Sequence, residues 1–340
     1  MRKSLTPTLV RFFQDCRMAV KWHGKLSEIK KLNGSGPQGS TIGLLEYLAQ
    51  SNQNSDCVEV NKRFKFIDDL TILEIVDLIS IGISSYNSKF QVPSDIPDHN
   101  GFIDPNNLES QNHINKISQW TTDQKMMLNQ KKSNIMIFNF SKTKKFTTRL
   151  TMNGEILPVV KKMKLLGTII CDDLKWDENT SFLIKKANSR LLLLRKAAQY
   201  TNLIEDLKSI YLSHVRVVLE QSCTIWHSSI TQENIDDLER VQKNAFRLIL
   251  GNKYTDYEES LNYLNLDKLS IRREKLSLKF GLNCAKNPKT IMLFKPRNNV
   301  HKQKIRKQNK FEIFKSKTER MERSAVPYLQ KLLNKQKFKK

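Results

Sequence analysis

The chain has 340 residues, of which 39% are hydrophobic, which is enough for two or three domains with buried cores and excludes wholesale disorder. Its 58 Lys and Arg residues outnumber its 34 Asp and Glu residues, so the formal net charge is +24 at pH 7. The positive side chains repel one another unless a polyanion offsets their charge. The excess therefore favours nucleic acid or an anionic membrane surface as the partner.

Cysteine spacing and hydropathy indicate the cellular compartment of the protein. The five cysteines are scattered without close pairs, which argues against a disulfide framework or a zinc knuckle and fits a reducing compartment. The most apolar internal segment, residues 70–83, contains Glu74 and Asp77, which are too costly in a lipid-facing helix. We therefore predict a soluble, intracellular protein of the nucleus or cytoplasm that does not contact a membrane.

The first part of the chain contains a hairpin pattern and a glycine-rich loop. Residues 20–25 alternate apolar and polar side chains up to Gly24, which predicts a hairpin. Residues 33–40 read Asn-Gly-Ser-Gly-Pro-Gln-Gly-Ser and precede a short apolar helix that Ser40 can cap. A loop of this composition leading into a helix favours phosphate, because its backbone can approach a ligand closely.

An acidic pair interrupts a second hairpin pattern. Residues 63–73 alternate as two strands that are separated by Asp68 and Asp69. Carboxylates held at a hairpin tip can bridge two divalent ions about 4 Å apart, as two-metal phosphoryl transfer requires. Taken alone, such a pair is more often a solvated turn. The glycine-rich loop upstream makes the metal-binding interpretation more specific.

The middle of the chain combines one helix with strands. Asp104 and Pro105 have the side chains typical of a helix start. The apolar face of that helix is formed by Ile114, Ile117 and Trp120. Residues 134–140 alternate like a strand, and Asn153-Gly154 predicts a two-residue hairpin turn.

From about residue 177 the apolar side chains recur every three or four residues, which predicts helices. The first stripe contains Leu183, Ala187, Leu191, Leu194 and Ala198; the second contains Leu207, Ile210, Tyr211, His214 and Val218; the third contains Ile235, Leu238, Val241, Ala245 and Leu248 and is closed by Gly251. On this pattern His214 is interpreted as a hydrogen-bonded core residue, and Trp176 and Trp226 as packing residues.

The last part of the chain carries most of the charge excess. Residues 286–340 hold 18 Lys and Arg against 3 acids, a net charge of +15. Apolar periodicity is weak there until residues 326–333, so we predict a mostly solvated arm with one short helix. Such an arm should bind phosphates by counterion release, and its deletion is expected to flatten the salt dependence of binding. The alternative is a basic localisation signal that leaves binding to the helical region.

These motifs together resemble those of reverse transcriptases from non-LTR (LINE-like) retrotransposons. The segment 36–40 before an apolar helix and Phe66-Ile67-Asp68-Asp69 on a hairpin resemble two signature motifs of that family. Residues 128–138 and the hairpin pattern at 164–170 resemble the next two elements, of which the second grips the primer end. Residues 185–191 and 238–245 read much like the thumb. The resemblance covers about residues 10–285.

The resemblance implies an α+β fold in three parts. Residues 1–175 would form a partial right-hand polymerase palm, an antiparallel sheet with helices. Residues 176–285 would form an α-helical, thumb-like region, and residues 286–340 a flexible basic tail. The implied activity is that of an RNA-directed DNA polymerase, which uses two Mg²⁺ or Mn²⁺ ions, an RNA template, a DNA primer and deoxynucleoside triphosphates.

The resemblance also assigns roles to single residues. Asp68 and Asp69 would bind the metal ions. Lys132 would neutralise the leaving pyrophosphate or act as its acid, although the adjacent Lys131 is an alternative. Contacts with the nucleotide and template would come from Pro37, Gln38, Gly39, Ser40 and Phe66.

One departure from the family pattern concerns the third metal ligand. The family places a further Asp on a strand upstream of the glycine-rich loop, but the only acids there are Asp15 and Glu28, and neither lies in that pattern. We therefore interpret the chain as a truncated copy that is inactive in isolation. Two alternatives stay open. An RNA-dependent RNA polymerase usually has Gly before the paired aspartates, where this chain has Ile67, and a non-catalytic nucleic-acid-binding relic fits the composition equally well.

Overall fold

The computed structural model describes residues 17–31, 63–66, 69–76, 102–140, 146–296 and 311–335. The chain divides into two compact units. Unit 1 contains residues 1–135 and 141–159, and unit 2 contains residues 136–140 and 160–340. Among the described residues, helix accounts for 56% and strand for 13%, and the sheets are small and mostly antiparallel. This mixture is compatible with the α+β class that the sequence predicts.

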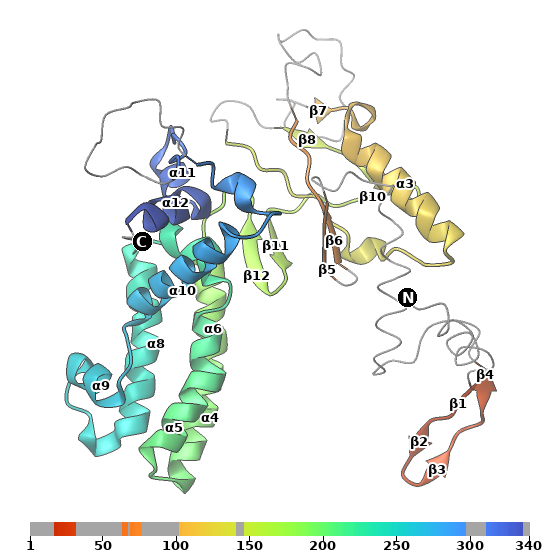
Figure 1. The fold of residues 1–340 in the computed structure, drawn as a ribbon. Coiled ribbons are helices and arrows are strands. Elements are labelled where there is room, and N and C mark those ends of the chain that lie inside the picture. The colour runs from red at the N-terminus through yellow and green to blue at the C-terminus, as the bar shows by residue number, and fades with distance from the viewer. Residues whose placement is uncertain are drawn as a thin grey trace, which may run out of the picture. The chain divides into compact units, whose positions relative to one another are not determined.

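In its described residues, unit 1 contains two-stranded sheets and one long helix (Figure 1). Its strands are β1 Arg17–Met18, β2 Lys21–Trp22, β3 Lys25–Leu26, β4 Lys30–Lys31, β5 Arg63–Phe66, β6 Asp69–Ile72, β7 Phe102–Ile103, β8 Thr147–Thr148, β9 Thr151–Met152 and β10 Glu155–Ile156. Its helical segments are η3 Pro105–Asn107, α3 Glu109–Asp123 and η4 Gln130–Lys132. The pairs β1–β4, β2–β3, β5–β6 and β9–β10 are antiparallel, and β7–β8 is parallel.

Two predicted hairpin turns in unit 1 are confirmed. His23 and Gly24 join β2 to β3 with φ values of 46° and 80°, and Asn153 and Gly154 join β9 to β10 with 51° and 83°. Positive φ at both central residues is the requirement of the type I′ turn, whose twist matches that of the paired strands.

The helix predicted after Asp104 is also confirmed. The Asp104 carboxylate accepts a hydrogen bond from the Asn106 backbone N–H at 2.9 Å, and α3 follows directly behind η3. The Glu74 carboxylate accepts the backbone N–H groups of Glu109 and Ser110, at 2.9 Å each. It thereby satisfies two donors at the start of α3 and ties the segment after β6 to this helix.

The strand predicted over residues 134–140 is reduced to a single bridge. Ile135 pairs with Val159 in parallel, and the Ile135 N–H donates to the Pro158 carbonyl at 2.9 Å. An alternating pattern of apolar and polar residues indicates which side chains would face the core of a strand, but a β-ladder also requires a partner strand. Among the described residues, Val159 is the only bridge partner of this segment.

In its described residues, unit 2 contains one hairpin followed by helices (Figure 1). The hairpin is β11 Lys162–Leu165 with β12 Thr168–Cys171. The helical segments are α4 Asp177–Tyr200, α5 Ile204–Ile210, the π-helical η5 Tyr211–Arg216, α6 Val217–Leu219, α7 Cys223–Trp226, η6 His227–Ser229, α8 Gln232–Leu250, η7 Gly251–Lys253, α9 Tyr257–Leu264, α10 Leu269–Cys284, η8 Ile291–Leu293, α11 Glu319–Arg323 and α12 Ala325–Lys335. In the part of the chain that the structure describes, no helix is long and apolar enough to cross a membrane.

The core of unit 2 lies between α4 and α8, which run side by side in Figure 1. Most members of the three predicted apolar stripes are buried in it. Those members are Leu183, Ala187, Leu191, Leu194, Leu207, Tyr211, Val218, Leu238, Val241 and Ala245. Trp226 is also completely buried, and its indole N–H donates to the Gln221 carbonyl at 2.9 Å. The packing role predicted for Trp226 is confirmed.

The prediction for His214 is wrong, because this side chain is exposed. Its ring nitrogen Nδ1 lies 2.8 Å from the Ser213 hydroxyl. The cause is the π-helical turn η5, which adds one residue to the turn and shifts the core-facing position from His214 to Val215. An α-helical period applied across this segment therefore assigns the wrong residue to the core.

The short helix predicted near residues 326–333 is confirmed as α12, but residues 311–335 are packed on unit 2 and are not a solvated arm. Helix α12 packs against α10, and Leu329 and Leu333 are buried in a cluster with Phe311. The Gln330 side-chain amide donates to the Leu293 carbonyl at 2.7 Å and accepts the Phe314 N–H at 2.8 Å. The amphipathic face of this helix thus belongs to the fold of unit 2.

We expect the stability of unit 2 to depend on pH through His227. Burial, and next the Arg273 guanidinium, lower the pKa of His227 to about 4 from 6.5. Between these two pH values the unfolded chain binds the extra proton, so the free energy of unfolding should fall as pH falls, by about 3 kcal/mol at pH 4. Urea denaturation of wild type and His227→Gln at pH 7.5 and 4.5 checks this, since the variant should lose less stability. Equal losses would contradict it.

Candidate nucleic-acid interface

Most of the residues that the resemblance assigns to a polymerase site lie outside the described residues. These are Pro37, Gln38, Gly39, Ser40 and Asp68. Phe66 ends β5 and pairs with Asp69, the exposed first residue of β6. Within the described ranges, no group of three or more His, Cys, Asp or Glu side chains could hold a metal ion. The metal-binding role of Asp68 and Asp69 therefore stays a prediction.

Lys132 ends the short helix η4, and its side chain is exposed, as is that of Lys131. The backbone N–H of Lys132 donates to the Asn129 carbonyl at 3.1 Å. Exposure leaves either lysine available to a phosphate, so its assignment to the pyrophosphate also stays a prediction.

The β11–β12 hairpin is fixed to the helices of unit 2 by three contacts around its turn. The Thr168 hydroxyl donates to the Ser222 hydroxyl at 2.8 Å, and the Ile169 N–H donates to the Asn179 side-chain carbonyl at 3.1 Å. At the turn itself, the Gln221 amide nitrogen lies only 2.3 Å from where a Cβ on Gly167 would be. The hairpin that the sequence compares with a primer-gripping element is thus held against α4 and the loop before α7.

The backbone conformation of Gly167 predicts a response to one added methyl group. Gly167 has φ of 85°, where an L side chain is strained by about 1 kcal/mol or more, and Ala would also meet Gln221. We expect Gly167→Ala to lower the free energy of unfolding by about 1 kcal/mol in urea denaturation, because the end of the Gln221 side chain can move aside while the backbone strain remains. Adding Gln221→Ala should therefore change this loss little. A Gly167→Ala protein as stable as wild type would contradict the strain.

Two lysines from different elements lie over one aromatic ring beside this hairpin. Lys164 of β11 has its ammonium nitrogen 4.7 Å from the centre of the Phe182 ring, and Lys186 of α4 has its own at 6.0 Å. Both distances lie within the range of cation–π attraction. Two cations and an aromatic ring at one junction are the combination that single-stranded nucleic acid uses, with phosphates on the cations and a base on the ring.

The positive charge continues along α4 at Arg190, one turn beyond Lys186. One terminal guanidinium nitrogen of Arg190 donates to the His214 carbonyl at 2.7 Å, which holds the side chain beside the π-helical turn. A guanidinium has five donors, so most of them stay available to another acceptor.

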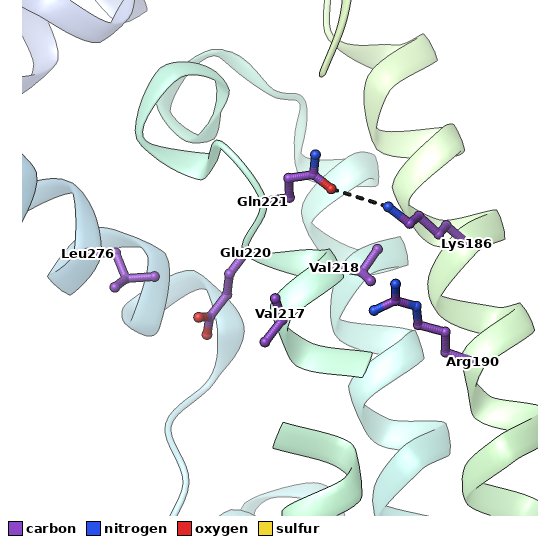
Figure 2. A pocket seen from close by; sticks show the side chains of 7 residues that line it. All are labelled: Lys186, Arg190, Val217, Val218, Glu220, Gln221 and Leu276. Atoms are coloured by element: carbon purple, nitrogen blue, oxygen red, sulfur yellow. Dashed lines mark hydrogen bonds between the residues drawn. The ribbon is translucent and has the colours of Figure 1, made fainter. Parts of the chain in front are cut away.

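A pocket opens between α4, α6 and α10 next to these cations. Its volume is about 370 Å³, and its lining residues are Lys186, Arg190, Val217, Val218, Glu220, Gln221 and Leu276. Figure 2 shows Lys186 and Arg190 projecting from α4 toward Gln221 and Val218, while the Glu220 carboxylate points to the side on which Leu276 of α10 lies. The Lys186 ammonium lies 3.5 Å from the Gln221 side-chain oxygen. The pocket therefore has a cationic wall, an apolar floor and one carboxylate.

The pocket carboxylate is partly neutralised from outside. Arg216 and Arg272 each place their Nε atom near Glu220 Oε1, at 3.4 and 3.2 Å. The Glu220 side chain is 14% exposed, so these pairs are partly shielded from water. The two ion pairs allow an acid to lie beside a cationic wall without cancelling its attraction for anions.

The resemblance assigns residues 185–191 to the thumb, but sequence reasoning missed Phe182, Glu220 and Gln221. Phe182 precedes Lys186 by four residues, which places the two on the same helix face and is the one signal available in the sequence. Glu220 and Gln221 follow the π-helical turn, and no periodic pattern marks them. Comparison with known protein families, with curated proteins and with solved structures finds no match for this chain.

Proposed function

We propose that the chain is the palm-and-thumb part of an RNA-directed DNA polymerase of the non-LTR retrotransposon kind, and that it holds nucleic acid across the β11–β12 hairpin and α4. The observation that carries the binding is the junction at Phe182, where Lys164 and Lys186 converge from two elements. The net charge of +24 supports the same partner. The family assignment rests on the motifs of the sequence.

The hairpin and α4 act together as a clamp in this proposal. Lys164 and Lys186 bind phosphates of the strand, and the Phe182 ring offers a surface on which a base or sugar packs. Thr168 and Asn179 hold the hairpin in place through their bonds to Ser222 and Ile169. Because the two cations are positioned before the strand arrives, less side-chain entropy is lost on binding.

In the polymerase, Asp68 and Asp69 would hold two Mg²⁺ or Mn²⁺ ions, whose chemistry is to lower the pKa of the primer 3′-hydroxyl and to neutralise the leaving pyrophosphate. Carboxylate oxygens are the ligands that these ions prefer, and Asp69 is exposed at the start of β6. Lys132 would donate to the pyrophosphate. Template RNA, primer DNA and a deoxynucleoside triphosphate are the implied partners.

The proposal is tested with an RNA template annealed to a labelled DNA primer. We expect a mobility shift with wild type and with the Asp68→Asn, Asp69→Asn double variant, because the clamp residues lie elsewhere. We expect no primer extension with Mg²⁺ or Mn²⁺, because the chain offers no third aspartate in the family pattern.

Absence of any shift at low salt would overturn the proposal. Extension that the double variant abolishes would support the polymerase assignment and overturn our expectation that the isolated chain is inactive. Binding without extension is also what a non-catalytic nucleic-acid-binding protein would give, and the upstream genomic reading frame separates these two cases.

A further inference from the structure

The pocket beside the clamp has the dimensions and lining of a ligand site. Pockets that enclose small molecules span about 300–1,000 Å³, and this one has a volume of about 370 Å³. A duplex cannot enter a space of this size, but one nucleotide can. Val217, Val218 and Leu276 supply apolar surface, and polar groups converge from the side of α4.

The cationic wall fits a phosphate group. Lys186 is bound only loosely, at 3.5 Å from the Gln221 oxygen, so its ammonium can turn to a stronger acceptor. Arg190 is held at one nitrogen by the His214 carbonyl, which fixes the guanidinium while leaving further donors. Charge-assisted bonds from both side chains to a phosphate are stronger than those they make now.

The opposite side of the pocket fits a hydrogen-bond donor. Both ion pairs of Glu220 go to Oε1, so Oε2 has no protein partner among the residues that the structure describes. A carboxylate oxygen can only accept a hydrogen bond. An occupant with its phosphate at α4 and its apolar ring against Leu276 therefore gains most when its far edge carries an amino group.

We propose that this pocket binds one unpaired nucleotide of a single strand and prefers a base with an amino group, such as cytosine. The phosphate lies on Lys186 and Arg190, the base packs against Val217 and Leu276, and the amino group donates to Glu220. A carboxylate accepting from the cytosine N4 amino group is a known mode of base reading. Uracil has a carbonyl oxygen at the same position, which a carboxylate repels. This inference rests on the proposed nucleic-acid binding and adds a base preference to it.

The preference is measured by fluorescence anisotropy with labelled RNA oligomers of cytidine and of uridine of equal length at pH 7.5. We expect wild type to bind the cytidine oligomer about tenfold more tightly. Val217→Trp should remove this preference, because Val217 is 56% exposed and a larger side chain there can fill the pocket without burying itself in the core. Glu220→Gln should also reduce it, because an amide offers a donor as well as an acceptor.

Ile271→Trp is the matched control, since Ile271 is 45% exposed on α10 and does not line the pocket. It should keep the preference. Equal binding of the two oligomers by wild type, or a Val217→Trp protein with unchanged preference, overturns the pocket assignment while the proposed function stands. Failure of wild type to bind either oligomer overturns the proposed function itself.

A free nucleotide presents the same groups as a nucleotide within a strand. Competition with CMP and UMP separates the two sources by affinity. Displacement of the cytidine oligomer by CMP at concentrations near the Kd of the oligomer assigns the pocket to a free nucleotide and overturns the requirement for a strand. Displacement by CMP in preference to UMP, and only at far higher concentrations, supports the strand assignment.

Discussion

Replacing Lys185, Lys186, Arg190 and Lys196 of α4 by Gln should weaken the binding of single-stranded nucleic acid by about 100-fold near physiological salt. Each phosphate contact on a single strand contributes about −0.7 to the slope of log K against log salt, so four lost contacts should flatten the slope by about three. Gln has nearly the helix propensity of Lys, and the helix should stay intact. Filter binding at several salt concentrations measures both quantities.

The choice of Lys186 and Arg190 follows from the orientation of α4, and Lys185 and Lys196 are added as exposed cations of the same helix. Lys186 and Arg190 each precede a buried residue, Ala187 and Leu191, by one position and lie on the flank of the helix that faces the pocket. Arg195 follows buried Leu194 and lies on the other flank, so we leave it unchanged.

A variant with the same loss of charge elsewhere separates a local surface from the net charge. Lys253, Lys279, Lys286 and Lys289 are exposed, and their replacement by Gln removes four charges from other parts of unit 2. We expect this variant to keep most of the wild-type salt slope. Equal losses in both variants would mean that binding follows the total charge and that α4 has no special role.

The sequence predicted well those elements whose conformation is determined by interactions among residues close together in the chain. Asn153-Gly154 specifies its turn because these residues accept positive φ, and Asp104 specifies a helix start because its side chain reaches the next free N–H. The apolar stripes of α4 and α8 are likewise local patterns. Each of these was readable without knowledge of the packing.

The candidate site was less predictable because its contacts join distant parts of the chain. Gln221 meets the hairpin turn at Gly167, and Lys164 meets Phe182, only after unit 2 has folded. The π-helical turn adds a further difficulty, because it shifts the residues that follow it relative to an α-helical period. The sequence pattern therefore does not predict that Glu220, which follows the π-helical turn, lines the pocket.

In the basic tail, residues 286–340, the average charge does not predict that α12 packs on the rest of unit 2. Charge averaged over residues 286–340 predicts an arm in water, and the apolar periodicity of residues 326–333 predicts a helix but not its packing. In the structure α12 places its leucines on one side and its cations on the other. Deleting the tail would therefore expose the face of α10 as well as remove charge. A flatter salt slope after truncation at residue 285 would not identify phosphate contacts. Replacement of the exposed Lys315 and Lys317 by Gln tests the electrostatic contribution without removing the helix.

Leu333→Ala should lower the free energy of unfolding of unit 2 by about 3 kcal/mol. Leu333 is completely buried, and its side chain packs on the Gly281 position of α10, where its Cδ1 atom would lie 3.6 Å from an added Cβ. Truncation of a leucine in such a place loses the transfer free energy of its methyl groups and leaves a cavity. Urea denaturation followed by far-UV circular dichroism measures the loss. Met321→Ala is the control, because Met321 of α11 is 40% exposed and should cost less than about 0.5 kcal/mol. If both variants unfold like wild type, α12 does not pack on α10 in solution, and the whole tail is the solvated arm that its charge predicts.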